Sequence, residues 1–180
     1  MVNLGDKMIC LIVGDFGVGK DTVANLLKKI SLERNDCIKT NKILSYTTRP
    51  PRYKGEDTHL FCTERQFLTF NDLIAQTVID DHYYGARSSQ FDKNKLNLYC
   101  VDSKGVHDVI KSEIDDVFVI EVIRPKWLIN LPDDRINRRR YSSYTYKTDY
   151  RIMNDGDMEK LKASVAECYN FILKEMKKSL

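Results

Sequence analysis

Three glycines and a lysine near the start of the chain have the spacing of a loop that binds phosphate groups. The segment Gly14-Asp15-Phe16-Gly17-Val18-Gly19-Lys20 follows an apolar run at 8–13 and precedes a helical pattern. Glycine lets the backbone turn tightly and bring its N–H groups close to an anion, and the lysine adds a full positive charge. A GxxxxGK loop between a strand and a helix binds nucleotide phosphates, and the first helical turn adds its positive dipole end. We therefore expect residues 14–20 to hold the phosphates of a nucleotide.

The residues after Lys20 depart from the usual pattern. A serine or threonine usually follows the lysine and ligates Mg²⁺, whereas here Asp21 follows and Thr22 comes one residue later. Nucleotide binding is still expected, because nucleoside monophosphate kinases of the adenylate kinase type have a similar GKxT ending. Either Thr22 or Asp21 could help to hold the metal through water, and the sequence leaves that route open.

A second candidate anion site lies in residues 45–56, which read SYTTRPPRYKGE. Arg49 and Arg52 flank a pair of prolines, which restricts the backbone of this loop. Guanidinium groups suit bidentate phosphate binding. A basic loop is also often just a solvated surface, so these residues alone leave both interpretations open.

The apolar pattern predicts strands that alternate with helices. Buried strands are expected at 8–13, 37–45, 96–101, 117–123 and 150–153, and helices at 20–30, 64–76, after Asp102 and from 158 onward. The helix at 64–76 is indicated by the capping-box spacing of residues 63–66 and the apolar residues behind it. This order predicts an α/β fold with a parallel sheet and the glycine loop at its carboxyl edge.

Composition limits the class of protein. The 180 residues suit one domain, and 42% hydrophobic with 31% charged residues is ordinary for a soluble globular chain. The net charge of +3 is small, so we expect no nucleic-acid partner. No apolar run suggests a membrane span or a signal peptide. The five irregularly spaced cysteines predict reduced thiols in a cytoplasmic protein.

Four segments, in order, resemble the guanylate kinase family. They are the glycine loop, the Ser-x-Thr-Thr-Arg-x-Pro-Arg and Gly-Glu pattern at 45–56, the NxYYG-like residues 83–85, and the DxxG-like residues 102–105. The resemblance runs from about Met8 to Ile172. It implies a single P-loop kinase domain over 1–180, with a parallel sheet flanked by helices, a core at 1–44, 97–132 and 149–180, an NMP-binding insertion at 45–96 and a short lid at 133–148.

The resemblance also implies an activity and its site residues. ATP with Mg²⁺ would donate its γ-phosphoryl group to a nucleoside monophosphate, in a monomer or a homodimer. The implied ATP-binding residues are Gly14, Asp15, Phe16, Gly17, Val18, Gly19, Lys20, Asp21, Thr22, Arg135 and Asn154, the last near the donor base. The implied NMP-binding residues are Ser45 near the base, Asp102 at the acceptor site, and Arg49, Arg52, His59 and Tyr84 around the phosphate. Lys20 and Arg49 would act in catalysis, together with Arg138 and Arg139 of the closing lid.

Three departures from the family concern the acceptor site. The stretch Ala75-Gln76-Thr77 lacks the glutamate that reads guanine, Ala86 replaces a serine or threonine, and His59 replaces a phosphate-binding tyrosine. Asp80 or Asp81 could replace the glutamate only if the loop is rearranged. A well-paired group reading a base edge is worth ~1–3 kcal/mol of discrimination. We therefore expect a phosphate clamp with weakened guanine selectivity: GMP or dGMP is the first expected acceptor, and another (deoxy)nucleoside monophosphate is the alternative.

Two other classes of protein compete with a kinase. Some guanylate kinase-like domains are non-catalytic protein-binding modules, but such a module predicts a degraded phosphate loop, and Lys20 with its three glycines is complete. A small P-loop ATPase or GTPase is disfavoured by Asp21 and by the arginine-rich loop at 45–56.

Overall fold

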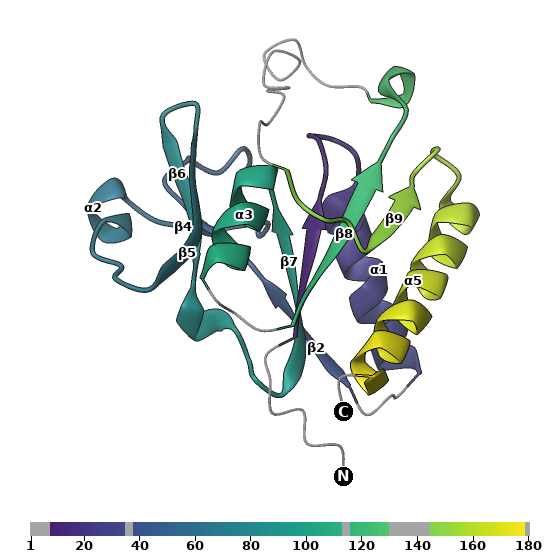
Figure 1. Ribbon diagram of the computed structural model, residues 1–180. Helices are drawn as coiled ribbons and strands as arrows, with labels where there is room; N and C mark the ends of the chain where they lie inside the picture. The colour runs from purple at the N-terminus through teal and green to yellow at the C-terminus, as the bar shows by residue number, and fades with distance from the viewer. Residues whose placement is uncertain (1–7, 35–37, 113–115, 130–144, 179–180) are drawn as a thin grey trace.

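The computed structural model describes residues 8–34, 38–112, 116–129 and 145–178. Its main sheet has five strands, all parallel, in the order β2-β7-β1-β8-β9 (Figure 1). Their bounds are β1 Ile9–Val13, β2 Lys39–Ile43, β7 Lys95–Val101, β8 Val117–Ile123 and β9 Tyr150–Met153. The predicted parallel α/β sheet is therefore confirmed.

The central strand β1 shows why the sheet forms from this sequence. All five of its residues are buried, as expected for a parallel strand covered on both faces. Successive side chains point to opposite faces, so Cys10 and Ile12 join one apolar cluster while Ile9, Leu11 and Val13 join the other. The sheet therefore separates two hydrophobic cores.

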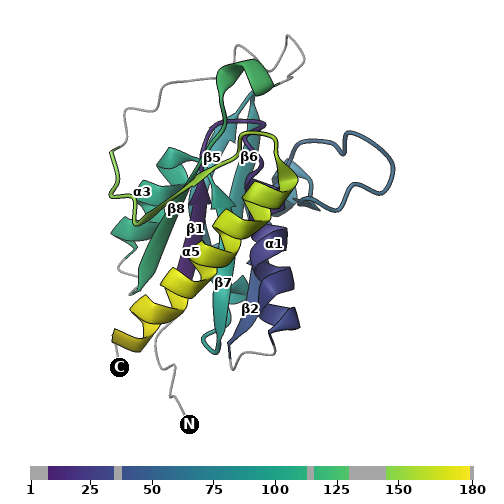
Figure 2. The same ribbon diagram turned by 90° about the vertical axis from the view of Figure 1, so that its right-hand side faces the viewer.

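Helices cover both faces of this sheet. On one face lie α1, Lys20–Glu33, and α5, Met158–Lys178, side by side (Figure 2). Apolar residues at helical spacing face the sheet from both, among them Val23 and Leu27 of α1 and Val165 and Ile172 of α5. On the other face lies α3, Ser103–Lys111, which also packs against the smaller sheet. None of the helices that the structure describes combines the length and apolarity needed to cross a bilayer.

A smaller sheet of four strands stands beside the main one, in the order β4-β3-β6-β5 (Figure 1). The bounds are β3 Tyr46–Thr47, β4 Leu60–Phe61, β5 Leu73–Ile79 and β6 His82–Arg87. Short helices complete the described elements: α2 at Glu64–Phe67, η1 at Ser88–Gln90 and η2 at Lys126–Leu128. The loop between β3 and β4 projects from this sheet (Figure 2).

The expected helix at 64–76 is wrong beyond its first turn. The capping box is present, since Thr63 accepts from the Gln66 N–H and Gln66 accepts from the Thr63 N–H, yet α2 ends at Phe67. The aromatic spacing that suggested a helix face instead covers the smaller sheet, with Phe67 stacked on Tyr83 and Phe70 against Tyr46. The β-branched residues further along form β5, where such side chains pack well.

A tight hairpin joins β5 to β6. Asp80 and Asp81 both have positive φ, 48° and 60°, as the two-residue turns that match strand twist require. Before it, β5 bulges at Ala75, whose φ is 53°, so the strand register shifts between Ile74 and Thr77. Asp80 and Asp81 therefore form the hairpin turn, and neither takes the position of the missing glutamate.

Candidate active site

The glycine loop leaves the carboxyl end of β1 and enters α1, as predicted. At Gly14, a side chain would collide with the carbonyl of Val122 on the neighbouring strand β8. Gly19 has φ 99°, and a Cβ there would lie 2.6 Å from the side-chain nitrogen of Asn154. These two positions therefore require glycine, because the loop passes directly over its neighbours.

Lys20 folds back into the loop. Its ammonium group donates to the carbonyl oxygens of Gly14, at 2.7 Å, and Asp15, at 2.9 Å, and lies over the ring of Phe16. Burial lowers the pKa of Lys20, while the charges of nearby carboxylates, Asp102 among them, oppose that change. The lysine therefore lies among the loop's own backbone, close to where bound phosphates would need its charge.

Asn154 braces the same loop from the far edge of the sheet. It follows β9, is 5% exposed, and its side-chain nitrogen donates to the carbonyl of Val18 at 2.8 Å. Its own N–H donates to the carbonyl of Ile123, which fixes it to β8. The resemblance places Asn154 near the donor base, and in the structure its side chain contacts the loop backbone.

We predict that replacing Asn154 with alanine weakens the binding of all nucleoside triphosphates equally. The change leaves the buried carbonyl of Val18 without its donor, which costs about 1–3 kcal/mol, or roughly 5- to 150-fold in affinity if the loop loosens. Titration with ATP and GTP measures this. A change in the ratio of the two affinities would instead indicate that Asn154 contacts the base.

Arg49 is held in a buried ion pair on the second loop. Its two terminal nitrogens donate to the carboxylate of Glu56, at 2.8 and 3.2 Å, and one also donates to the carbonyl of Pro50. The guanidinium lies over the ring of Phe61, with 5.3 Å to the centroid. Burial works to lower the pKa of Arg49, but Glu56 and the nearby Tyr84 outweigh it and raise the pKa. The Nε of Arg49 is a buried donor with no partner among the described residues.

Glu56 is the organising residue of this loop, and sequence reasoning missed it. Its carboxylate accepts from Arg49, from the N–H of Arg52 at 2.6 Å and from the hydroxyl of Thr58 at 2.7 Å. The hydrogen bond from Arg49 is the main cause that lowers the pKa of Glu56 to about 2. The only sequence signal was the Gly-Glu that ends the loop pattern, which does not say where the glutamate points.

This lowered pKa makes a prediction about stability and pH. Because the folded pKa lies below the ordinary value of 4.5, the ionised Glu56 stabilises the fold fully above about pH 4.5, and this contribution is lost as pH falls toward 2. Glu56→Gln should therefore lower the free energy of unfolding at neutral pH, and the gap to the wild type should narrow below pH 4.5. Urea unfolding of both proteins across this range measures the gap. A gap independent of pH would contradict the assignment.

Two further predicted acceptor residues lie beside this ion pair. The rings of His59 and Tyr84 meet edge to face, with centroids 5.7 Å apart. Tyr84 belongs to β6 and is paired in register with Thr47 of β3, which lies just before the arginine loop. The structure therefore brings Arg49, His59 and Tyr84 together. Arg52 is near them, 3.7 Å from the carboxylate of Glu56, with its side chain 41% exposed.

The second loop lies within electrostatic reach of the helix that follows the first loop. The charge of Asp21, on the first turn of α1, reaches His59 strongly enough to oppose the lowering of its pKa by burial and Arg49. Asp102 follows β7, the neighbour of β1, and caps α3 by accepting from the N–H of Gly105 at 2.7 Å. Ser45 follows β2, and its hydroxyl lies 3.1 Å from that of Tyr99. Ser45, Asp102 and the glycine loop each follow a parallel strand of the main sheet, at its carboxyl edge, where ligands bind in open α/β folds.

Two of the positions where the resemblance would place base-reading groups are apolar. Ala86 has no exposed surface and Ala75 is 5% exposed. Both belong to the hydrophobic cluster that includes Tyr99, Val101 and Val106. Ala75 and Ala86 therefore pack in the hydrophobic core and supply no polar group where the sequence lacks a carboxylate.

Thr22 and Asp21 are the residues predicted to help hold Mg²⁺. Asp21 has a side chain 59% exposed and forms an ion pair with Lys42 at 3.1 Å, and Thr22 lies in the first turn of α1. Within the described ranges, no cluster of three or more histidine, cysteine or acidic residues could hold a metal on its own. Mg²⁺ in nucleotide sites relies on phosphates, waters and one or two side chains. A carboxylate and a hydroxyl beside Lys20 fit that role.

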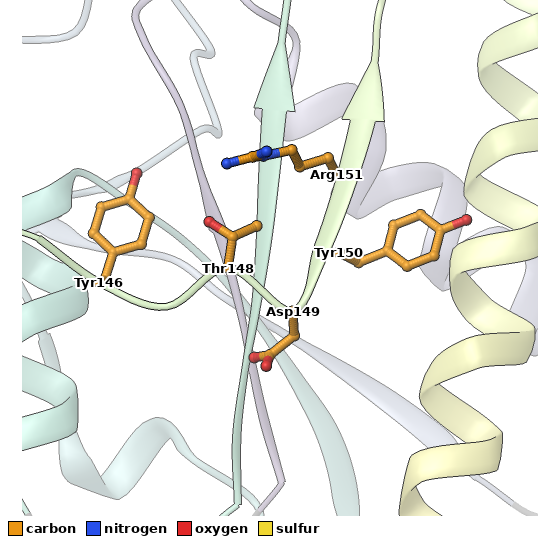
Figure 3. A pocket seen from close by; sticks show the side chains of 5 residues that line it. All are labelled: Tyr146, Thr148, Asp149, Tyr150 and Arg151. Carbon is orange, nitrogen blue, oxygen red and sulfur yellow. The ribbon is translucent and has the colours of Figure 1, made fainter.

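Arg135, Arg138 and Arg139 lie outside the described residues, as does most of the expected lid at 133–148. The next segment along the chain lines a shallow pocket of five residues, Tyr146, Thr148, Asp149, Tyr150 and Arg151 (Figure 3). Arg151 and Tyr150 project to opposite sides of β9, and Arg151 pairs with Glu121 of β8 at 2.7 Å.

Comparison with known proteins identifies the fold. The chain matches the crystal structure of guanylate kinase from Anaplasma phagocytophilum with a TM-score of 0.64 and 22% sequence identity. The match covers 95% of this chain and 86% of that one. This chain has a guanylate kinase-like P-loop fold. No protein-family model matches the chain, and no curated protein matches it in sequence.

Proposed function

We propose that this protein is an ATP-dependent nucleoside monophosphate kinase, with GMP or dGMP as the first expected acceptor. The observation that carries the proposal is the arrangement of two basic loops at one edge of the sheet. One loop places backbone N–H groups and Lys20 at the carboxyl end of β1, and the other holds Arg49 and Arg52 around Glu56. A site with two facing anion pockets suits the transfer of a phosphoryl group from one nucleotide to another.

In this proposal the protein works by alignment and charge. The glycine loop and Lys20 would bind the donor phosphates, while Arg49, Arg52, His59 and Tyr84 would hold the acceptor phosphate in line with them. Bound Mg²⁺, with Thr22 or Asp21 contributing through water, would supply further positive charge to the donor phosphates. The insertion at 45–96 would carry the acceptor and the lid at 133–148, with Arg135, Arg138 and Arg139, would exclude water.

The acceptor base is the least constrained part of the proposal. Ser45 remains the expected base contact and Asp102 an expected residue of the acceptor site, but Ala75 and Ala86 offer no hydrogen bond from their side chains. We therefore expect guanine to be preferred only weakly, with other (deoxy)nucleoside monophosphates as competing acceptors. A cytoplasmic location, where these nucleotides and ATP are abundant, would suit this activity.

The test is ADP formation from ATP with and without each of GMP, dGMP, AMP, dTMP and dCMP. The proposal predicts turnover that depends on an acceptor, with a product that gains one phosphate. ADP formation at the same rate with and without an acceptor would indicate an NTPase instead. No turnover with any acceptor would favour a protein-binding module.

A further inference from the structure

The hydrogen bonds of His59 determine which of its ring nitrogens carries the proton. The hydroxyl of Thr58 lies between Oε1 of Glu56, at 2.7 Å, and Nδ1 of His59, at 2.9 Å. Glu56 is ionised at all ordinary pH values and can only accept. The single hydroxyl hydrogen of Thr58 therefore goes to Glu56, and its oxygen accepts from His59. Neutral His59 thus carries its proton on Nδ1 and leaves a bare lone pair on Nε2, which makes no hydrogen bond with a described residue.

The surroundings of His59 favour the neutral ring in the free protein. Burial is the main cause that lowers its pKa, and the positive charges of Arg49 and Arg52 add to it. The carboxylates of Asp21, from α1, and Glu56, from its own loop, act in the opposite direction. The ring of Tyr84 from β6 packs against it. The net result is a lowered pKa, so the ring is neutral near pH 7.

The same ring borders the place where the acceptor phosphate would lie. Its neighbours are Tyr84 and the ring of Phe61, which Arg49 covers. The Nε of Arg49 is a buried donor left without a partner among the described residues, as expected for a group that awaits an anion. A phosphate oxygen next to a bare Nε2 lone pair would be repelled, whereas a protonated Nε2 would donate a charge-assisted hydrogen bond.

We propose that His59 takes up a proton from solvent on Nε2 when the acceptor phosphate binds, so that acceptor affinity is linked to pH at this residue. This inference rests on the proposed function, because it places the phosphate of a nucleoside monophosphate between Arg49, Arg52 and Tyr84. A contacting anion raises the pKa of such a ring by about 1–3 units. Acceptor affinity should therefore fall up to tenfold per pH unit as pH rises from the pKa of the free ring to that of the complex.

Histidine NMR tests this directly, because the chain has only three histidines. The ring signals of His59, assigned by their loss in His59→Gln, are titrated in the free protein, with saturating GMP and with guanosine. We expect GMP to raise the pKa of His59 by at least about one unit, a tenfold change in its proton affinity. Guanosine, which lacks the phosphate, should leave it unchanged, and His82 and His107 serve as internal references. An unchanged pKa of His59 in protein saturated with GMP would overturn the inference.

Kinetics give a second readout that does not depend on assignment. His59→Tyr replaces the ring with a hydroxyl donor that does not titrate near neutral pH, so the KM for the acceptor should lose its pH dependence beyond the part due to the nucleotide's own ionisation. The KM for ATP should follow the wild type. Equal pH dependence of the acceptor KM in both proteins would overturn the inference about His59 but would not affect the proposed kinase function. If no nucleoside monophosphate binds or supports ADP formation, the proposed function fails and the inference fails with it.

Discussion

Replacing Lys20 with alanine is expected to abolish phosphoryl transfer while leaving the fold in place. The ammonium group lies within the glycine loop, on the carbonyls of Gly14 and Asp15, and donor phosphates would need its charge as the transferring group leaves. Removing one such preorganised charge typically costs 100- to 1,000-fold or more in rate, about 3–4 kcal/mol. Thermal unfolding should change little, because water can reach the two carbonyls once the side chain is gone. The coupled ADP assay measures the rate.

A matched control lies on the same helix. Lys29 has a side chain 66% exposed and pairs with Glu33, one turn away. Lys29→Ala should therefore transfer phosphate at the wild-type rate. Wild-type turnover by the Lys20 variant would show that this lysine has been assigned wrongly.

Replacing Arg49 with alanine is expected to cost both stability and acceptor binding. The side chain of Glu56 is 1% exposed and that of Arg49 is 9% exposed, so the variant leaves a buried carboxylate without its partner. Breaking such a pair costs about 3–5 kcal/mol of unfolding free energy. Affinity for the acceptor should fall much more than affinity for ATP. Urea unfolding and separate titrations with ATP and GMP measure the two effects.

Arg52→Ala separates these effects. The side chain of Arg52 is 41% exposed. The backbone N–H of Arg52 donates a hydrogen bond to Glu56 that holds the loop, and the substitution keeps this N–H. This variant should lose acceptor affinity but change stability by less than about 1 kcal/mol. If Arg49→Ala were no less stable than Arg52→Ala, the buried pair would not hold the loop.

The parts of the fold that sequence predicted are those set by local patterns. The buried run of β1, the glycine loop and the apolar stripes of α1 and α5 each depend on a few adjacent residues, and the structure confirms them. The helix expected at 64–76 failed because a capping box fixes only the first turn. Beyond Phe67 the backbone is set by the packing of aromatic side chains across the smaller sheet.

In the candidate site, too, contacts between distant residues could not be predicted from the sequence. Arg49, His59 and Tyr84 lie near one another in the structure, and only the resemblance to the guanylate kinase family had implied that they share a site. The role of Glu56 depends on three donors converging on one carboxylate from residues 49, 52 and 58, which no spacing rule reveals. The contact of Asn154 with Val18 joins residues 136 positions apart and likewise required the structure.

The central claim is that the two anion pockets face each other at a separation that places two nucleotides end to end. A dinucleotide that joins adenosine and guanosine through five phosphates would span both pockets, and its binding can be measured by calorimetry. We predict that it binds at least about 100-fold more tightly than ATP or GMP alone, because one molecule fills both pockets. Lys20→Ala and Arg52→Ala should each reduce that affinity. Binding no tighter than that of ATP, with displacement of ATP but not of GMP, would contradict the account.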